Sequence, residues 1–297
     1  MKKTFYLCAA ALAMATMSCG GVQTNNNQNN EGENQDQQTQ EADEFGNEES
    51  YPWVFPEGQK NGELKEGETV LSIHSFYPNK IKESDDPANE TYIYYNGTLK
   101  SVGEKKSMVG DVEMPNSLII PIPEGQTAKK GDIVLTWWQS GSGMQRAIVT
   151  DDSNPKQPKV CYLDMDWTED GKGFANSHAN EQLKPNSFVV LKDGEMTPGQ
   201  PIYIEGDYTK LILLSAHEKY TLCKGFAGKI GSYYSQYVKL VPLHQNLQPG
   251  DKIRADFVGT YNDGYTVEKV DETIGRVWAK DSFDKTKIFS ILDVLKE

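Results

Sequence analysis

The apolar residues of this 297-residue chain fall into short runs, and turn-forming residues separate them. From residue 51 onward most runs span four to six residues, with Gly, Pro, Asn or Asp between them. Runs of this length and punctuation are typical of strands joined by turns, whereas helical periodicity is scarce. The pattern predicts strands at residues 70–73, 91–95, 118–122, 133–138, 146–150, 160–164 and 188–191. We therefore expect an all-β body.

Two turn motifs predict the tips of β-hairpins. Asn96-Gly97 separates two β-prone segments, and this dipeptide is the strongest short-range hairpin signal because both residues tolerate positive φ. Gly141-Ser142-Gly143 predicts a second tip.

Short motifs of the first half recur in the second half in the same order. The offset between matched motifs falls steadily from 132 to 101, as expected if the first half carries additional loop residues. The matched segments are Gly67-Glu68-Thr69-Val70 with Gly199-Gln200-Pro201-Ile202, Thr98-Leu99 with Thr221-Leu222, Ile120-Pro121-Ile122 with Val241-Pro242-Leu243, Lys130-Gly131-Asp132-Ile133 with Pro249-Gly250-Asp251-Lys252, Val160-Cys161-Tyr162-Leu163-Asp164 with Val277-Trp278-Ala279-Lys280-Asp281, and Phe188 with Phe289. We predict an internal duplication with β-barrel units at 51–192 and 193–297.

The later part of each unit resembles the SH3-like small β-barrels of the Tudor type. The first unit has a Gly-Asp-hydrophobic strand at Gly131-Asp132-Ile133-Val134, then Met144-Gln145-Arg146-Ala147-Ile148-Val149, then Val160-Cys161-Tyr162-Leu163-Asp164. The second unit matches more loosely, at Gly250-Asp251, Tyr265-Thr266-Val267 and Val277-Trp278. The resemblance implies tandem small barrels, but a fold of this kind does not fix a function.

The first eighteen residues have the parts of a secretory signal peptide. Lys2 and Lys3 precede an uncharged apolar run at 5–17. As a helix this run rises only about 20 Å, whereas a hydrocarbon core is roughly 30 Å thick, so we expect cleavage rather than a membrane span. Cleavage after Ala13-Met14-Ala15 would release a soluble protein.

Thr16-Met17-Ser18-Cys19 resembles the lipobox of Gram-negative bacterial lipoproteins, although Thr16 stands where that family usually has Leu. The resemblance implies that Cys19 is lipidated and becomes the new N-terminus, with several acyl chains that anchor the protein durably. Cys8 has almost no apolar run before it and cannot take this role. The expected location is the outer membrane of the cell envelope, with the body facing either the periplasm or the exterior.

Residues 19–50 read as the lipidated Cys19 followed by a disordered acidic tether. The whole chain carries a net charge of −13, and loss of Lys2 and Lys3 with the signal peptide leaves −15. Eight acidic and no basic residues lie in 20–50, so the body keeps −7. Such a polar, charged segment cannot bury a core, and it suits a spacer between membrane and body. The absence of a basic stripe argues against a nucleic-acid partner.

Only Cys161 and Cys223 remain as possible thiols in the body. They could pair in an oxidising compartment, or they could be buried free cysteines.

Aromatic residues are the main candidates for ligand binding. Trp137 and Trp138 are adjacent in an expected strand, so one faces the core and the other faces outward. The Tudor resemblance implies a groove lined by aromatics, and Trp138, Tyr162 and Trp167 are the nearest positional matches. An aromatic cage could take a cation or a sugar face. The alternative is that these rings fill the small barrel cores.

The segment 164–185 is an insertion that the second unit lacks, and we expect recognition to concentrate there. Its Asp166, Thr168 and Asp170, followed by Gly171, imitate the start of a calcium loop. Position twelve of that loop is Ser177 rather than Glu, which excludes an EF-hand. Asp166 and Asp170 are therefore only weak metal candidates, and we expect no metal site and no cofactor.

No catalytic motif is present. His74, His178, His217 and His244 show no metal-ligand spacing, and a nucleophile elbow or phosphate loop is lacking. We expect a non-catalytic interaction module that is held at the membrane by its lipid and binds an envelope protein, peptide or glycan. The alternatives are a glycan-binding module with exposed Trp or Tyr, and an envelope hydrolase with a site between the two units.

Overall fold

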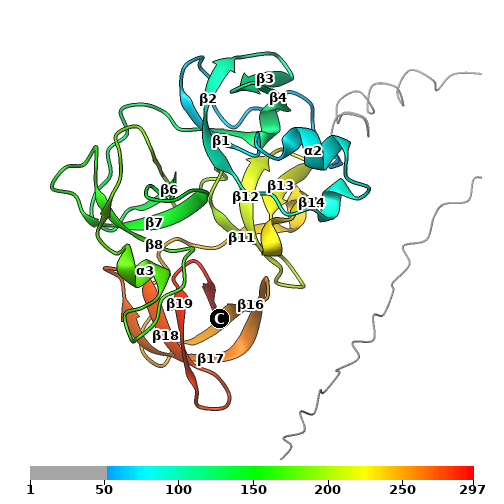
Figure 1. The fold of residues 1–297 in the computed structure, drawn as a ribbon. Coiled ribbons are helices and arrows are strands. Elements are labelled where there is room, and N and C mark those ends of the chain that lie inside the picture. Colours follow the sequence, from blue (N-terminus) through cyan, green and yellow to red (C-terminus); the bar gives the residue numbers. More distant parts are fainter. Residues whose placement is uncertain (1–51) are drawn as a thin grey trace, which may run out of the picture.

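The computed structural model describes residues 52–297, so the predicted signal peptide, the predicted lipidation site Cys19 and the predicted tether lie outside the described residues. The described part is all-β, as predicted, and consists of four antiparallel sheets of five strands each (Figure 1). Within it, no helix is long and apolar enough to cross a membrane.

The sheets follow one another along the chain, and we number them from first to fourth. The first comprises β1 (Thr69–Ser72), β2 (Tyr95–Ser101), β3 (Lys106–Val109), β4 (Val112–Pro115) and β5 (Ile119–Pro121). The second comprises β6 (Ile133–Trp137), β7 (Met144–Asp151), β8 (Lys159–Tyr162), β9 (Glu181–Gln182) and β10 (Val189–Val190). The third comprises β11 (Pro201–Ile204), β12 (Lys210–Ala216), β13 (Tyr220–Lys224), β14 (Ile230–Tyr234) and β15 (Val238–Leu240). The fourth comprises β16 (Lys252–Phe257), β17 (Thr260–Asp271), β18 (Arg276–Lys280), β19 (Thr286–Ser290) and β20 (Val294–Lys296).

The helical elements are short. They are α2 (Tyr77–Lys82), α3 (Phe174–Ser177) and the 3₁₀ turns η1 (Pro87–Asn89), η2 (Asn116–Leu118), η3 (Phe226–Gly228) and η4 (Ser235–Tyr237).

All four sheets share one strand order. Four consecutive strands form a meander, and the fifth strand returns to pair antiparallel with the first, as in the order β4-β3-β2-β1-β5. The second, third and fourth sheets repeat this order with their own strands, and none of the four closes on itself. The sheets are arranged around a common centre (Figure 1).

The same glycine turn precedes the first strand of every sheet. Gly67, Gly131, Gly199 and Gly250 have φ values of 89°, 93°, 94° and 95°. In each case the residue after the glycine closes the turn by donating its N–H to the carbonyl three residues earlier, and the glycine N–H bonds to the second strand. A turn of this type needs positive φ at its third position, which glycine adopts without steric cost.

Each predicted unit contains two sheets rather than one, and the predicted boundary after residue 192 falls between β10 and β11. Of the matched motifs, the Gly67 and Gly199 segments each open a first strand. The pair Thr98 and Thr221 does not match in the structure, because Thr98 lies in the second strand of its sheet and Thr221 in the third.

The predicted hairpin at Asn96-Gly97 is wrong. Both residues lie inside β2, where Gly97 pairs with Val70 of β1. A Cβ on Gly97 would meet Val109 Cγ1 at 2.8 Å and His74 Cε1 at 3.1 Å. This glycine therefore permits close packing across the strand and does not form a turn.

The predicted strand at 91–95 is also wrong except for its last residue, Tyr95, which begins β2. Residues 92–94 instead cross between two other sheets: Tyr92 N–H donates to Gly228 O, and Tyr94 O accepts from Met144 N–H. The segment is apolar because Tyr92 and Tyr94 are fully buried between sheets. The other six predicted strands overlap β1, β5, β6, β7, β8 and β10, and Gly141-Ser142-Gly143 joins β6 to β7 as expected.

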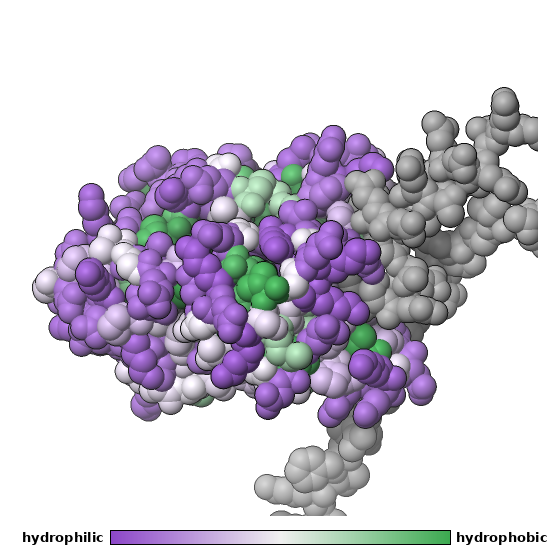
Figure 2. Space-filling view, turned by 90° about the horizontal axis from the view of Figure 1, so that it is seen from above, coloured by the Kyte–Doolittle hydropathy of each residue, from purple (hydrophilic) through white to green (hydrophobic). Residues whose placement is uncertain are grey.

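One apolar core joins the sheets. The largest buried cluster takes residues from all four, for example Leu99, Ile148, Leu214 and Val277. The second and third sheets have smaller clusters of their own. Outside this core the face shown in Figure 2 is mainly hydrophilic, with small separate apolar patches.

Candidate functional site

The structure places two of the three predicted ligand-binding aromatics together. Trp138, just after β6, is half-buried and packs edge-on against His178 at 5.1 Å between ring centroids. Tyr162 of β8 approaches the same histidine at 6.4 Å, is fully buried, and accepts a hydrogen bond from Gln139 N–H at 3.0 Å. Trp167 is half-buried elsewhere, 5.7 Å from the guanidinium of Arg276.

The 164–185 insertion packs against the fourth sheet. Arg276 of β18 donates to backbone oxygens of Tyr162, Leu163 and Met165, and Trp278 Nε1–H donates to Glu169. Asp170 accepts bonds from Thr168 Oγ1 and Lys172 N–H, which form a local turn. In residues 52–297, no group of three or more His, Cys, Asp or Glu side chains could hold a metal ion.

Cys161 and Cys223 are both buried free thiols, in the second and third sheets respectively. Burial raises the pKa of both thiols, so neither is activated as a nucleophile.

A polar pocket lies where the second, third and fourth sheets meet, and we call it the junction pocket. It has a volume of about 230 Å³. Its twelve lining residues include five charged side chains, namely Arg146, Asp164, Lys210, Lys224 and Asp256. Backbone bonds tie its walls together, because Lys210 N–H donates to Gly259 O and Tyr261 N–H donates to Tyr208 O.

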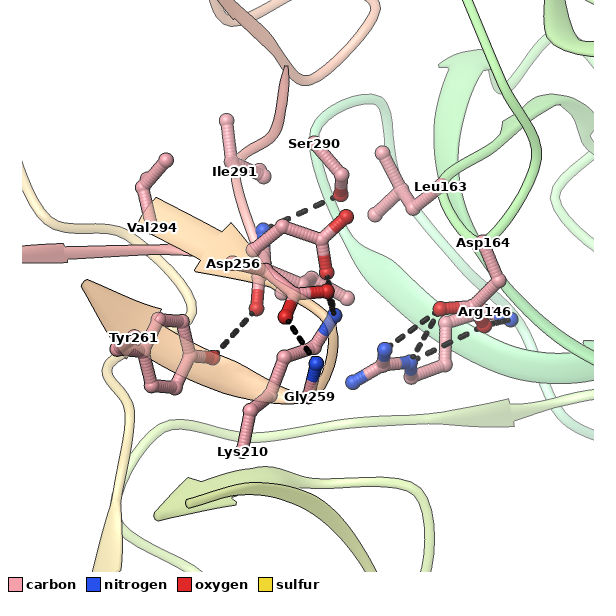
Figure 3. A network of polar contacts seen from close by, with 12 residues as sticks. Arg146, Leu163, Asp164, Lys210, Asp256, Gly259, Tyr261, Ser290, Ile291 and Val294 are labelled. Carbon is pink, nitrogen blue, oxygen red and sulfur yellow. Dashed lines mark hydrogen bonds and ion pairs between the residues drawn. The ribbon is translucent and has the colours of Figure 1, made fainter. Parts of the chain in front are cut away.

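One half of this charged network is fully paired (Figure 3). Lys210 of β12 lies 2.8 Å from Asp256 and also contacts Asp293, so one ammonium serves two carboxylates of the fourth sheet. Burial opposes the charge on Lys210, but the two carboxylates outweigh it and raise the pKa of Lys210. Tyr261 closes this half by donating its hydroxyl to Leu292 O at 2.9 Å. We call this the closed half.

The other half is incompletely paired. Arg146 of β7 is 1% exposed and binds Asp164 through Nε at 3.1 Å and Nη2 at 2.5 Å. Its Nη1 is buried and has no hydrogen-bond partner among residues 52–297, and the same holds for Oε1 of Gln145. Both residues line the pocket. Buried polar atoms are normally satisfied, so orphan atoms in residues that line a cavity indicate a missing water or ligand.

Lys224 of β13 completes this open half. It is half-buried, lines the pocket, and forms no hydrogen bond or ion pair through its ammonium within the described part of the chain. Desolvation lowers the pKa of Lys224, and the favourable charge of Asp164 does not offset it, because the positive charge of Arg146 also lowers the pKa. The open half thus presents two cationic groups with unused donor capacity.

Sequence reasoning missed this pocket, although a signal was present. Arg146 and Lys210 stand in or beside strongly apolar strand sequences, and charged residues are almost never fully buried unless they are paired. The pocket contains no histidine or cysteine among its lining residues.

No protein-family model matches the chain, and no curated protein is significantly similar to it.

Proposed function

We propose that this protein is a lipid-anchored binding module of the cell envelope, and that the junction pocket takes a small ligand through an anionic group, carboxylate or phosphate. The observation that carries the proposal is the buried, unpartnered Nη1 of Arg146 beside the unpaired Lys224. An anion there would satisfy both cations, and hydrogen bonds to charged groups are the stronger ones. Oε1 of Gln145 would accept a hydrogen bond from a donor next to the anion.

A non-catalytic role agrees with the composition of the pocket. Its acids, Asp164 and Asp256, are engaged with Arg146 and Lys210, and neither carboxylate is left as a general base. The lining contains no Ser, Thr, Cys or His, the side chains that most hydrolases use as nucleophile or general base.

The proposal extends to the fold: the four sheets are SH3-like units that arose by duplication of a pair. The shared strand order and glycine turn support this. In the first and third sheets a 3₁₀ turn, η2 or η4, leads directly into the fifth strand. In the second and fourth, an aspartate after the glycine caps its own turn, with Asp132 bound to Lys129 N–H and Asp251 to Gln248 N–H. The 3₁₀ turn and the aspartate cap therefore alternate from sheet to sheet, which is the pattern expected if a pair of different sheets was duplicated.

Thermal denaturation of the mature protein with a panel of small anions tests the pocket. The panel is acetate, glycolate, glycine, glycylglycine and phosphate, each compared with chloride at equal ionic strength. At a concentration about 100 times the Kd, a ligand adds about 2.7 kcal/mol of stability, which is readily measured. Lys224→Met should abolish the shift, and Lys192→Met, whose side chain is 69% exposed and does not line the pocket, should preserve it. A pocket filled by water alone would give no shift with any anion and would contradict the proposal.

Anchoring is tested separately. Cys19→Ala should move the protein from the detergent phase to the aqueous phase or leave it uncleaved. Unchanged detergent partitioning would contradict lipidation.

A further inference from the structure

A second concave surface lies on the third sheet, away from the junction pocket, and we call it the tyrosine groove. It has a volume of about 480 Å³, within the usual size range of small-molecule sites. β13 and β14 supply Tyr220, Ser232, Tyr233 and Tyr234, and η4 supplies Tyr237. Trp53 lines it from the N-terminal side.

The groove carries no charge. None of its nine lining residues is acidic or basic, although 25% of the residues in the chain are charged. In contrast, five of the twelve residues that line the junction pocket are charged. Burying an unpaired charge against such a surface would be costly, so the groove favours an uncharged occupant.

The aromatic side chains of the groove all carry a polar group. The chain has ten phenylalanines, yet only Tyr and Trp supply rings to this surface. Tyr234 and Tyr237 are 58% and 48% exposed. The hydroxyl of Ser232 is buried and has no hydrogen-bond partner in the described part of the chain. A purely apolar partner that covered Tyr237 would take its hydroxyl out of water without offering it a hydrogen bond.

The aromatic rings of the groove form two surfaces that stand nearly perpendicular to each other. Tyr220 and Tyr234 stack at 5.1 Å between centroids with 29° between their planes. Tyr237 stands at 85° to Tyr234, with centroids 6.5 Å apart. The face of an aromatic ring carries partial negative charge and attracts weakly positive C–H groups. A sugar ring has C–H groups on its face and hydroxyls at its edge, so it can pack on one ring while it bonds to hydroxyl groups beside it.

From these features we propose that the tyrosine groove binds an uncharged glycan, independently of the anionic ligand of the junction pocket. The sugar packs against Tyr234 and Tyr237, and its hydroxyl groups form hydrogen bonds with the hydroxyl of Tyr237. This assigns glycan recognition to the third sheet, whereas the sequence directed attention to Trp138, Tyr162 and Trp167 in the second.

Calorimetric titration of the mature protein with four uncharged hexasaccharides tests the proposal. The probes are maltohexaose, cellohexaose, xylohexaose and the N-acetylated chitohexaose. At least one should bind, and Tyr234→Ala with Tyr237→Ala should weaken it by about tenfold or more. Tyr234→Phe, which keeps the ring, should cost less than Tyr234→Ala. Phe283→Ala removes an aromatic residue that is 81% exposed on the fourth sheet and should leave binding unchanged.

Three results would overturn the proposal. One is that no hexasaccharide binds at about 5 mM, which corresponds to a free energy of only about 3 kcal/mol. Another is that a folded double variant, with an unchanged melting temperature, binds as well as the native protein. The third is that a proline-rich decapeptide binds to the groove and the sugars do not. Lys224→Met leaves sugar binding intact, so failure of the anion site and failure of the glycan site are separately visible.

Discussion

The two halves of the junction network contain the same kinds of side chain in opposite states. In the closed half, the ammonium of Lys210 forms ion pairs with the carboxylates of Asp256 and Asp293. In the open half, Lys224 has no carboxylate of its own, and Nη1 of Arg146 has no partner among the described residues. The pKa shifts of the lysines have opposite signs accordingly, raised for Lys210 and lowered for Lys224.

The difference distinguishes paired charges, which stabilise the fold, from unpaired cations, which can bind an anion. A buried ion pair costs desolvation on both sides, and its main consequence is that removal of one partner is expensive. A buried cation without a partner costs the fold free energy, which a bound anion can recover. Stability and binding measurements on the two lysines should therefore give opposite results.

The largest effect is expected for Lys210→Met. The variant leaves Asp256 and Asp293 next to each other without their shared cation, and breaking a buried pair in this way costs about 3 kcal/mol. For a body of this size the melting temperature should fall by roughly 6–12 °C. Urea denaturation followed by tryptophan fluorescence measures the loss, with Lys192→Met as the control. A change below about 1 kcal/mol would show that the closed half does not stabilise the fold.

Arg146→Met should have the next largest effect, a loss of about 2 kcal/mol. It strands one carboxylate, Asp164, instead of two. The same variant should lose the response to the anion panel. If Arg146→Met were more destabilising than Lys210→Met, Arg146 would have a structural rather than a binding role.

Lys224→Met should leave stability unchanged or raise it by up to about 1 kcal/mol, because it removes an ammonium whose desolvation is only partly compensated by Asp164. The substitution is chemically identical to Lys210→Met, which makes the two variants a matched pair. A destabilisation of Lys224→Met comparable to that of Lys210→Met would remove the distinction between the halves.

The smallest expected effect is in the pH dependence of unfolding. Because the pKa of Lys224 is lowered in the folded state, the unfolded state binds more protons between that lowered value and 10.5, and stability rises with pH in this window. The raised pKa of Lys210 acts oppositely: its contribution is present below 10.5 and is lost as pH rises through the folded value. Denaturation at several pH values between 8 and 10.5 should show a rise in the native protein that Lys224→Met lacks.

The strand content could be predicted from the sequence because short apolar runs and turns are local signals. Six of the seven predicted strands overlap strands of the structure. The failures involve residues whose role depends on distant neighbours. A side chain at position 97 would clash with Val109 and His74, which come from other parts of the chain. Residues 92–94 resemble a strand because they are apolar, but they lie between sheets.

The predicted site shows the same limit. Trp138, Tyr162 and Trp167 could be chosen from the Tudor-like pattern, but the contacts of Trp138 and Tyr162 with His178 and of Trp167 with Arg276 depend on the tertiary fold. The junction pocket draws Arg146, Lys224 and Asp256 from three different sheets. No local sequence pattern predicts that these three sheets meet. The only signal of the pocket in the sequence is the presence of charged residues in or beside apolar strands.

The most direct test is to titrate the side-chain nitrogen of Lys224 by NMR, in protein with ¹⁵N-labelled lysine, with and without the panel anions. The Lys224 signal is identified by its loss in Lys224→Met. We predict a pKa below 10.5 in the free protein and an increase when an anion fills the pocket, while the raised pKa of Lys210 stays unchanged. A Lys224 pKa at its ordinary value that no anion shifts would contradict the account.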